Sequence, residues 1–250
     1  MSKKILGIIP ARYASTRFPG KPLADICGKP MIQRVYERAL KSKSLCGVLI
    51  ATDDEKIFNA VKNFDLPDGS QGGQAVMTDS NLPNGTARCE QAAKIYNENI
   101  DAVINIQGDE PLLDPLMIDE VAELLNECEC ATLCSELEND FSNPNIVKVV
   151  MSQNNYALYF SRSLIPYKRN KTDLKIYQHI GIYGYSFEFL KKYVTLPPTP
   201  LSEAESLEQL KILEHGYKIK IKATSSKIKS LGVDTPEDLE RVREIINAKF

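Results

Sequence analysis

The sequence predicts an α/β protein with a mainly parallel central sheet and a smaller mixed-sheet insertion. Two patterns indicate this class. Through the first half of the 250-residue chain, short β-branched runs alternate with helical stretches, which is the order of right-handed βαβ crossovers. From about residue 131 to 199 this alternation gives way to strand-like segments separated by polar loops. We therefore expect an α/β core at 1–130 and 200–250, interrupted by a strand-rich subdomain at 131–199.

The first strand is predicted at Ile5–Pro10, and a helix at Met31–Lys41 follows it. A second strand and helix are predicted at Gly47–Thr52 and Asp54–Phe64. The uninterrupted apolar run Asp101–Gln107 is typical of a central strand covered on both faces. The other elements expected in this half are a strand at 75–77, a helix at 86–98 and a helix at 111–126.

In the second half, strands are predicted at 146–151, 157–161, 181–185 and 219–224. The Pro-rich stretch 196–200 predicts a rigid connector. A helix is expected to open at Ser202, because Glu205 stands three residues on, the spacing of a capping box. A last helix is expected after Thr235, which can cap it, with Pro236 at its first position.

The charge balance excludes a broad electrostatic surface for nucleic acid. The chain has 31 basic and 33 acidic residues and a net charge of −2, so any anion must be bound by a local cluster. No apolar run approaches the roughly 18 to 20 residues that cross a bilayer. We expect a soluble, cytoplasmic protein without nucleic-acid or membrane partners.

Six cysteines in such a chain are expected to be reduced rather than paired in disulfides. Cys128, Cys130 and Cys134 are close enough in sequence to raise the alternative of a structural zinc site. They lack both a CxxC pair and a nearby histidine, so small buried thiols are the simpler interpretation.

A basic loop follows the first strand. Three cations, two hydroxyl groups and a glycine stand within ten residues there: Arg12, Ser15, Thr16, Arg17, Gly20 and Lys21. Ligands of open parallel sheets gather outside the carboxyl ends of the strands, where arginine forks, a lysine and backbone amides can bind a triphosphate. The alternative is an ordinary solvated loop. The segment matches neither the GxxxxGK[ST] nor the GxGxxG pattern.

Two aspartates stand at junctions that can face this loop. Asp109 follows the apolar strand 101–107, and Asp234 precedes the last helix. A pair of carboxylates can bind Mg²⁺, which prefers carboxylates, water and phosphate oxygens. Taken alone, each aspartate is better explained as a helix cap, which is the more frequent use of Asp at such junctions. Together with the basic loop, the pair favours the metal interpretation.

Nine stretches along nearly the whole chain carry a family resemblance: IIPARYASTRFPGKPL, KPMI, ATDDEKI, INIQGDEPLL, NPNIVKVV, YALYFSR, HIGIYGY, SLEQLKIL and GVDTPEDLERV. In these stretches and in their order, the chain resembles the 3-deoxy-manno-octulosonate cytidylyltransferase family, also called CMP-Kdo synthetases.

The resemblance implies a Rossmann-like nucleotidyltransferase fold, dependence on Mg²⁺, and a homodimer formed by the 131–199 subdomain, which would also bind the sugar. It implies that the anomeric hydroxyl of the octulosonate (Kdo) attacks the α-phosphorus of CTP, giving CMP-Kdo and pyrophosphate for lipopolysaccharide or capsule biosynthesis. Metal at the aspartates would polarise the α-phosphate, while Arg12 and Lys21 would neutralise charge on the pyrophosphate.

Carried over by position, the resemblance assigns three groups of residues. The catalytic group is Arg12, Lys21, Asp109 and Asp234, with metal at the two aspartates. The nucleotide-binding group is Pro10, Ala11, Arg12, Ser15, Lys21, Thr86, Arg88 and Gln107. The sugar-binding group is Arg162, His179, Tyr183, Glu208 and Gln209. From the residues alone, strand packing explains Tyr183, a hydrogen-bonded structural role explains His179, and a solvated helix face explains Glu208 and Gln209.

One position departs from the family. Where its members show S/N-G-T-E-R, this chain has Asn84, Gly85, Thr86, Ala87 and Arg88. Losing the glutamate bears on substrate preference more than on reaction type. This departure favours one alternative, a cytidylyltransferase for another acidic sugar, such as an 8-amino or sialic-like acid. A separate alternative is a non-catalytic nucleotide-binding protein of the same fold.

Overall fold

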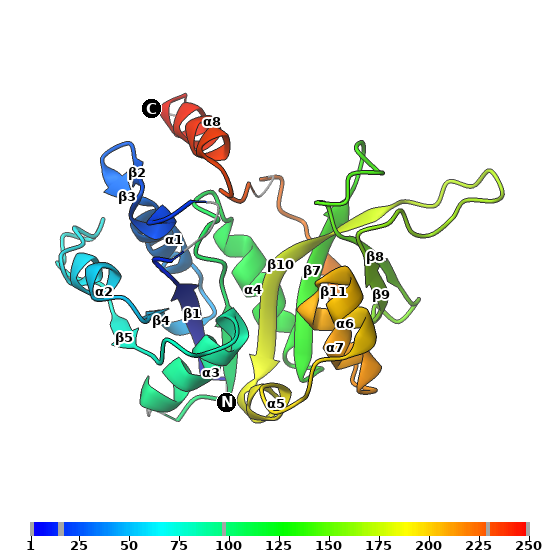
Figure 1. Ribbon diagram of the computed structural model, residues 1–250, viewed down its shortest axis with the longest axis horizontal. Coiled ribbons are helices and arrows are strands. Elements are labelled where there is room, and N and C mark those ends of the chain that lie inside the picture. Colours follow the sequence, from blue (N-terminus) through cyan, green and yellow to red (C-terminus); the bar gives the residue numbers. More distant parts are fainter. Residues whose placement is uncertain (1–2, 15–17, 97–98, 229–230, 249–250) are drawn as a thin grey trace. The chain divides into compact units, whose positions relative to one another are not determined.

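A computed structural model describes residues 3–248 except 15–17, 97–98 and 229–230. The chain divides into two compact units (Figure 1). The first comprises residues 1–119 and 226–250, and the second comprises residues 120–225. The mixed α/β architecture agrees with the fold class that the sequence predicts.

The first unit is built on four parallel strands in the order β6–β1–β4–β5. Their bounds are β1 (Ile5–Ala11), β4 (Leu45–Thr52), β5 (Ala75–Met77) and β6 (Ala102–Asn105). Ile8, Ile50 and Ile104 are fully buried, as strands covered on both faces require. All four lie within or next to the runs that predicted them.

Helices connect these strands. They are α1 (Met31–Ala39), α2 (Glu55–Lys62) and α3 (Gly85–Tyr96). Asp54 caps α2, because its side chain accepts the backbone N–H groups of Lys56 and Ile57. The helix α4 (Pro115–Leu124) continues from the first unit into the second.

A second, smaller core of the first unit joins both ends of the chain. The turn η1 (Lys21–Leu23) and the hairpin of β2 (Asp25–Ile26) and β3 (Lys29–Pro30) precede α1. The core links Ile26 of β2 and Met31 of α1 with the last helix α8 (Pro236–Asn247). Its buried members are Ile26, Met31, Leu112, Val233, Leu239, Val242 and Ile246. This core fixes residues 231–235 beside the segment that follows the basic loop.

The second unit is a mixed sheet with three helices. Its strands are β7 (Cys130–Glu136), β8 (Lys148–Met151), β9 (Ala157–Ser161), β10 (Tyr177–Ser186) and β11 (Lys220–Ala223). β7 pairs parallel with β11 and antiparallel with β10, while β8 pairs antiparallel with β9 and β10. The helices are α5 (Phe187–Tyr193), α6 (Pro200–Glu205) and α7 (Glu208–Glu214).

The borders of the units correct the predicted ones. Residues 200–225 belong to the second unit and not to the predicted α/β core, because β11 pairs in parallel with β7 and α7 packs on β9. The expected capping box at Ser202 is also displaced. Thr199 caps α6, Ser202 is its third residue, and Ser206 with φ 50° ends the helix.

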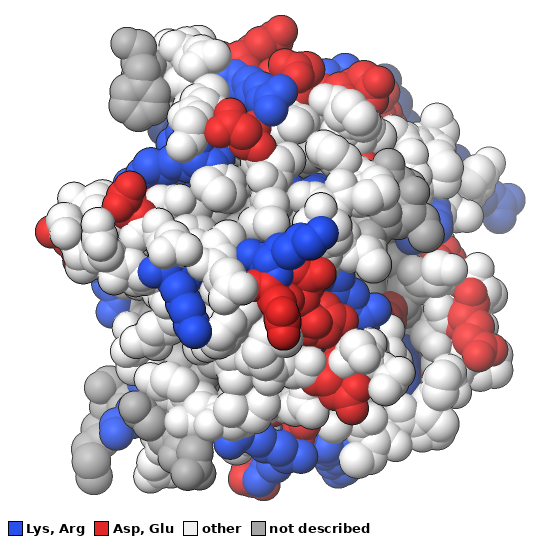
Figure 2. Space-filling view, turned by 60° about the vertical axis from the view of Figure 1, so that its left-hand side comes forward, with Lys and Arg blue, Asp and Glu red and all other residues white. Residues whose placement is uncertain are grey.

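Among the described residues, no helix combines the length and the apolar character that a membrane crossing requires. On the face drawn in Figure 2, basic and acidic side chains are interspersed, in keeping with the net charge of −2. Anion binding on this face therefore depends on local geometry rather than on a field of one sign.

Candidate active site

The candidate active site lies at the carboxyl ends of two neighbouring parallel strands, β1 and β6. β1 and β6 leave the sheet at the same edge, so the segment after Ala11 and the segment after Asn105 face each other. Gly108 makes their approach possible, since a Cβ there would lie 3.0 Å from the carbonyl oxygen of Pro10. Its small size thus serves the contact between the two loops.

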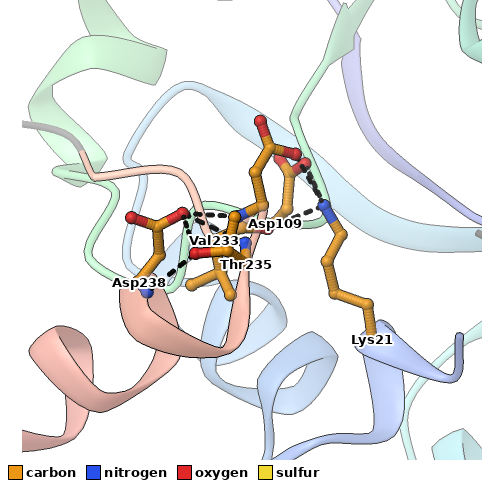
Figure 3. A network of polar contacts seen from close by, with 6 residues as sticks. Lys21, Asp109, Val233, Thr235 and Asp238 are labelled. Atoms are coloured by element: carbon orange, nitrogen blue, oxygen red, sulfur yellow. Dashed lines mark hydrogen bonds and ion pairs between the residues drawn. The ribbon is translucent and has the colours of Figure 1, made fainter. Parts of the chain in front are cut away.

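Lys21 joins the two predicted aspartates (Figure 3). Its Nζ lies 2.7 Å from Asp109 Oδ2, 3.4 Å from Asp234 Oδ1 and 2.7 Å from the carbonyl oxygen of Val233. The Lys21 side chain is 14% exposed, against 33% for Asp109 and 49% for Asp234. Two carboxylates distant in sequence therefore converge on one cation at the rim of the first unit.

The backbone holds this arrangement together. The N–H of Val233 donates to the carbonyl oxygen of Asp109 at 2.9 Å, and the Val233 side chain is buried in the smaller core. Lys21 follows Gly20, whose φ of 71° is favourable for glycine. The turn that carries Asp234 is thus docked on the loop that carries Asp109.

Neither aspartate is a helix cap. Thr235 caps α8, as the sequence predicts, and its side chain accepts the N–H of Asp238. α4 begins at Pro115, beyond reach of a cap at Asp109 and four residues later than expected from 111–126. The capping alternative is therefore wrong for both.

The donor set fits Mg²⁺. Within the described residues, no three or more His, Cys, Asp or Glu side chains are grouped to hold a metal. Mg²⁺ does not need such a group, because it is usually held by one or two carboxylates, water and substrate phosphates. That the Lys21 ammonium lies between Asp109 and Asp234 also marks this point as one that favours positive charge.

The three clustered cysteines lie in or just before β7. Cys130 and Cys134 are buried free thiols. Burial raises the pKa of Cys134 to about 12 and holds that of Cys130 well above its ordinary value, so both stay protonated. They are the small buried residues that the sequence favours.

The other predicted nucleotide residues surround this edge of the sheet. Arg12 donates from its guanidinium to the carbonyl oxygen of Leu82, which precedes α3. Thr86 is buried in the first turn of α3, and its Oγ1 lies 3.5 Å from Asn105 Nδ2. Gln107 follows β6, Pro10 and Ala11 end β1, and Ser15 lies outside the described residues.

Arg88 does not face solvent. Its side chain is fully buried, and its guanidinium donates to Asp53 Oδ2 at 2.8 Å and to Thr78 Oγ1. Asp53 follows β4 and Thr78 follows β5. Arg88 thus ties α3 to the ends of two strands. Ala87 beside it is 8% exposed, so the departure from the family lies in the buried first turn of α3.

In the second unit, His179 and Tyr183 lie on β10 with ring centroids 5.2 Å apart. His179 Nε2 is 3.1 Å from Thr132 Oγ1. Burial lowers the pKa of His179 to about 3, so the imidazole is neutral. The Tyr183 hydroxyl is buried without a hydrogen-bond partner among the described residues, which is rare for a polar group in a protein interior.

The Arg162 guanidinium is already engaged in the second unit. It donates to the carbonyl oxygens of Glu205 at 2.7 Å, Pro144 at 3.0 Å and Ser206 at 3.4 Å. These bonds fasten the loop after β9 to the end of α6. A carboxylate fork at Arg162 would have to use its remaining N–H groups.

Glu208 and Gln209 open α7, two residues beyond the Ser206 that Arg162 contacts. Gln209 is 8% exposed, so the solvated-face interpretation is wrong for it. Both predicted residues therefore lie next to the loop that Arg162 fastens.

Sequence reasoning missed Lys148. Its side chain is fully buried in β8 and donates to the carbonyl oxygens of Asn143 at 2.8 Å, Ile146 at 2.7 Å and Arg162 at 2.5 Å. Its signal is a single lysine inside the apolar run IVKVV. A buried ammonium needs such partners, so Lys148 holds the backbone on which Arg162 lies.

This fold and site define a nucleotidyltransferase of the α/β class. Residues 6–221 match the cytidylyltransferase family. The chain therefore belongs to this family of CTP-dependent nucleotidyltransferases.

Curated relatives are similar over the whole length. The 3-deoxy-manno-octulosonate cytidylyltransferase of Fusobacterium nucleatum is 50% identical over 96% of this chain and 95% of its own. The 8-amino-3,8-dideoxy-manno-octulosonate cytidylyltransferase of Shewanella putrefaciens is 46% identical over 98% of this chain and 99% of its own.

A solved structure of CMP:2-keto-3-deoxy-manno-octonic acid synthetase complexed with CTP has a TM-score of 0.90 and 40% identity. The similarity covers 99% of this chain and 100% of that one. The family resemblance inferred from the sequence is therefore confirmed.

Proposed function

We propose that this protein transfers CMP from CTP to 3-deoxy-manno-octulosonate and releases pyrophosphate. One observation carries the proposal: Lys21, at the end of the basic loop, contacts both Asp109 and Asp234. A cation-binding point beside a loop suited to phosphates is what nucleotidyl transfer requires. The names of the relatives, and the similarity to a CTP complex, support this choice of substrates.

In this proposal the anomeric hydroxyl attacks the α-phosphorus, a new O–P bond forms, and the bond to the pyrophosphate oxygen breaks while the hydroxyl proton passes to solvent. Asp109 and Asp234 would hold Mg²⁺. When bound, the ion supplies Lewis-acid polarisation of the α-phosphate and favours deprotonation of the hydroxyl. Lys21 and Arg12 would then neutralise the negative charge that develops on the departing pyrophosphate.

On the sugar side, the neutral His179 and the unpartnered Tyr183 hydroxyl would donate or accept hydrogen bonds to sugar hydroxyls. Glu208 and Gln209 would add polar groups from the start of α7. Arg162 would receive the sugar carboxylate with its free N–H groups, held in place by its three carbonyl bonds.

The test is release of pyrophosphate with CTP and this sugar acid, compared with ATP, GTP and UTP. The proposal expects turnover with CTP far above that with the other nucleotides, and none when a chelator removes Mg²⁺. Equal turnover with all four nucleotides, or full activity in the chelator, would contradict it.

A second acceptor deserves the same assay, because Ala87 replaces a glutamate of the family and relatives from Shewanella are named for the 8-amino sugar. The assay runs both acids, and a sialic acid, at equal concentration. A higher kcat/KM for the 8-amino acid would reassign the acceptor and leave the reaction unchanged. A non-catalytic protein of this fold would release no pyrophosphate with any acid.

We also propose that the protein acts as a homodimer in the cytoplasm and supplies lipopolysaccharide or capsule biosynthesis, as the family resemblance implies. Light scattering of the purified protein tests the oligomeric state. A mass of 28.0 kDa, that of one chain, would contradict the dimer.

A further inference from the structure

The Asp238 carboxylate lies behind the Asp234 turn (Figure 3). Its Oδ2 accepts the backbone N–H of Asp234 at 3.2 Å and that of Thr235 at 3.1 Å. The Thr235 hydroxyl lies 3.1 Å from the same oxygen. One carboxylate oxygen thus gathers three polar groups of the turn that presents Asp234.

These contacts exceed what capping α8 requires. A capping box needs one bond from the side chain of the third helical residue to the N–H of the cap, here Asp238 to Thr235. In the second box of this chain, the side chain of Ser202 likewise accepts the N–H of its cap Thr199, and the residue before that cap is Pro198, which has no N–H to donate. The additional bond to the Asp234 N–H therefore acts on the aspartate itself.

The residue before Asp234 has contacts of its own. The N–H of Val233 donates to the carbonyl oxygen of Asp109, its carbonyl oxygen accepts from Lys21, and its side chain is buried. Without Asp238, the peptide between Val233 and Asp234 would lose its N–H partner and could rotate. The Asp234 carboxylate would then leave the point where it meets Lys21 and Asp109.

We infer that Asp238 is a positioning residue, whose carboxylate holds the backbone of Asp234 so that the two metal-binding carboxylates converge. This inference rests on the proposed metal role of Asp109 and Asp234. The Asp238 carboxylate itself is directed at the backbone of this turn, as the dashed lines in Figure 3 show. Partners that orient metal ligands in this way typically change metal affinity by roughly 10- to 100-fold.

The experiment measures Mn²⁺ affinity by electron paramagnetic resonance in protein saturated with CTP and without sugar, so that nothing turns over. The variants are Asp238→Ala and Asp238→Asn, and the latter keeps the side-chain volume and one acceptor oxygen. Glu237→Gln is the charge control, since it removes an exposed acid from the same turn. Asp54→Ala is the cap control, since it removes the cap of α2. Thermal unfolding is recorded for all.

The inference expects Mn²⁺ affinity to fall about 10-fold or more in Asp238→Ala and less in Asp238→Asn. The Mn²⁺ affinity of both controls should stay within about twofold of wild type. This should hold even where Asp54→Ala lowers the thermal stability as much as Asp238→Ala does. If Asp238→Ala does not fold, Asp238→Asn decides, with at least a threefold loss expected.

Asp109→Asn separates the two possible failures. If it loses Mn²⁺ binding while the Asp238 variants bind like wild type, the positioning role is overturned and the metal role stands. If Asp109→Asn binds Mn²⁺ like wild type, the proposed metal site is wrong and the inference falls with it.

Discussion

Replacing Arg88 by methionine tests the buried ion pair that links α3 to the strand ends. The substitution keeps most of the side-chain length but removes the guanidinium that bonds to Asp53 and Thr78. Breaking a buried pair by removing one partner costs about 3–5 kcal/mol. Because Asp53 is 17% exposed and water can reach it, we expect the lower end, about 3 kcal/mol.

The assay is urea unfolding followed by far-UV circular dichroism, since the chain has no tryptophan. A loss of about 3 kcal/mol corresponds to a fall in the melting temperature of roughly 6 to 12 °C for a chain of this size. Asp53→Asn in the Arg88→Met background should cost much less than the sum of the single changes, because no unpaired charge remains. A cost below about 1 kcal/mol for Arg88→Met, or strict additivity, would refute the account of this pair.

Two further predictions concern Lys21 and His179. Lys21→Met should reduce turnover with CTP by about 100-fold or more, because a charge aimed at the transition state is lost; steady-state pyrophosphate release measures this, and a change below about fivefold would contradict it. For His179, a folded pKa of about 3 against the ordinary 6.5 means that the unfolded chain takes up the proton first as the pH falls between these values. As the pH falls from 6.5 to 4, wild type should therefore lose free energy of unfolding relative to His179→Gln, by at most about 1.4 kcal/mol per pH unit. Urea unfolding of both proteins at several pH values measures this, and a difference in unfolding free energy that stays constant with pH would contradict it.

The sequence predicts the site of the first unit because parallel strands constrain where their loops go. The apolar runs before Arg12 and Asp109 identify two buried strands, and buried parallel neighbours must end at one edge. Asp234 has no such strand before it. Its convergence on Asp109 depends on the bond from Val233 and on the smaller core of α8, which no local pattern encodes.

Side chains that act by holding backbone are harder to predict than those that face a ligand. Lys148 and Asp238 each bond to backbone groups brought together by the fold, and their sequence signals are only a lysine in a strand and an acid in a capping box. The border of the second unit was misplaced for a related reason. The sequence of the short strand at Lys220 does not specify its neighbour, and its parallel pairing with β7 places it in the second unit.

The most direct test of the account compares turnover and nucleotide binding in Asp109→Asn. Because Asp109 is taken to hold the metal while the triphosphate is bound mainly by cations and amides, pyrophosphate release should fall by about 100-fold or more and the Kd for CTP, measured by calorimetry, should change by less than about tenfold. Turnover near the wild-type rate in this variant would contradict the claim that the paired carboxylates beside Lys21 are the catalytic centre.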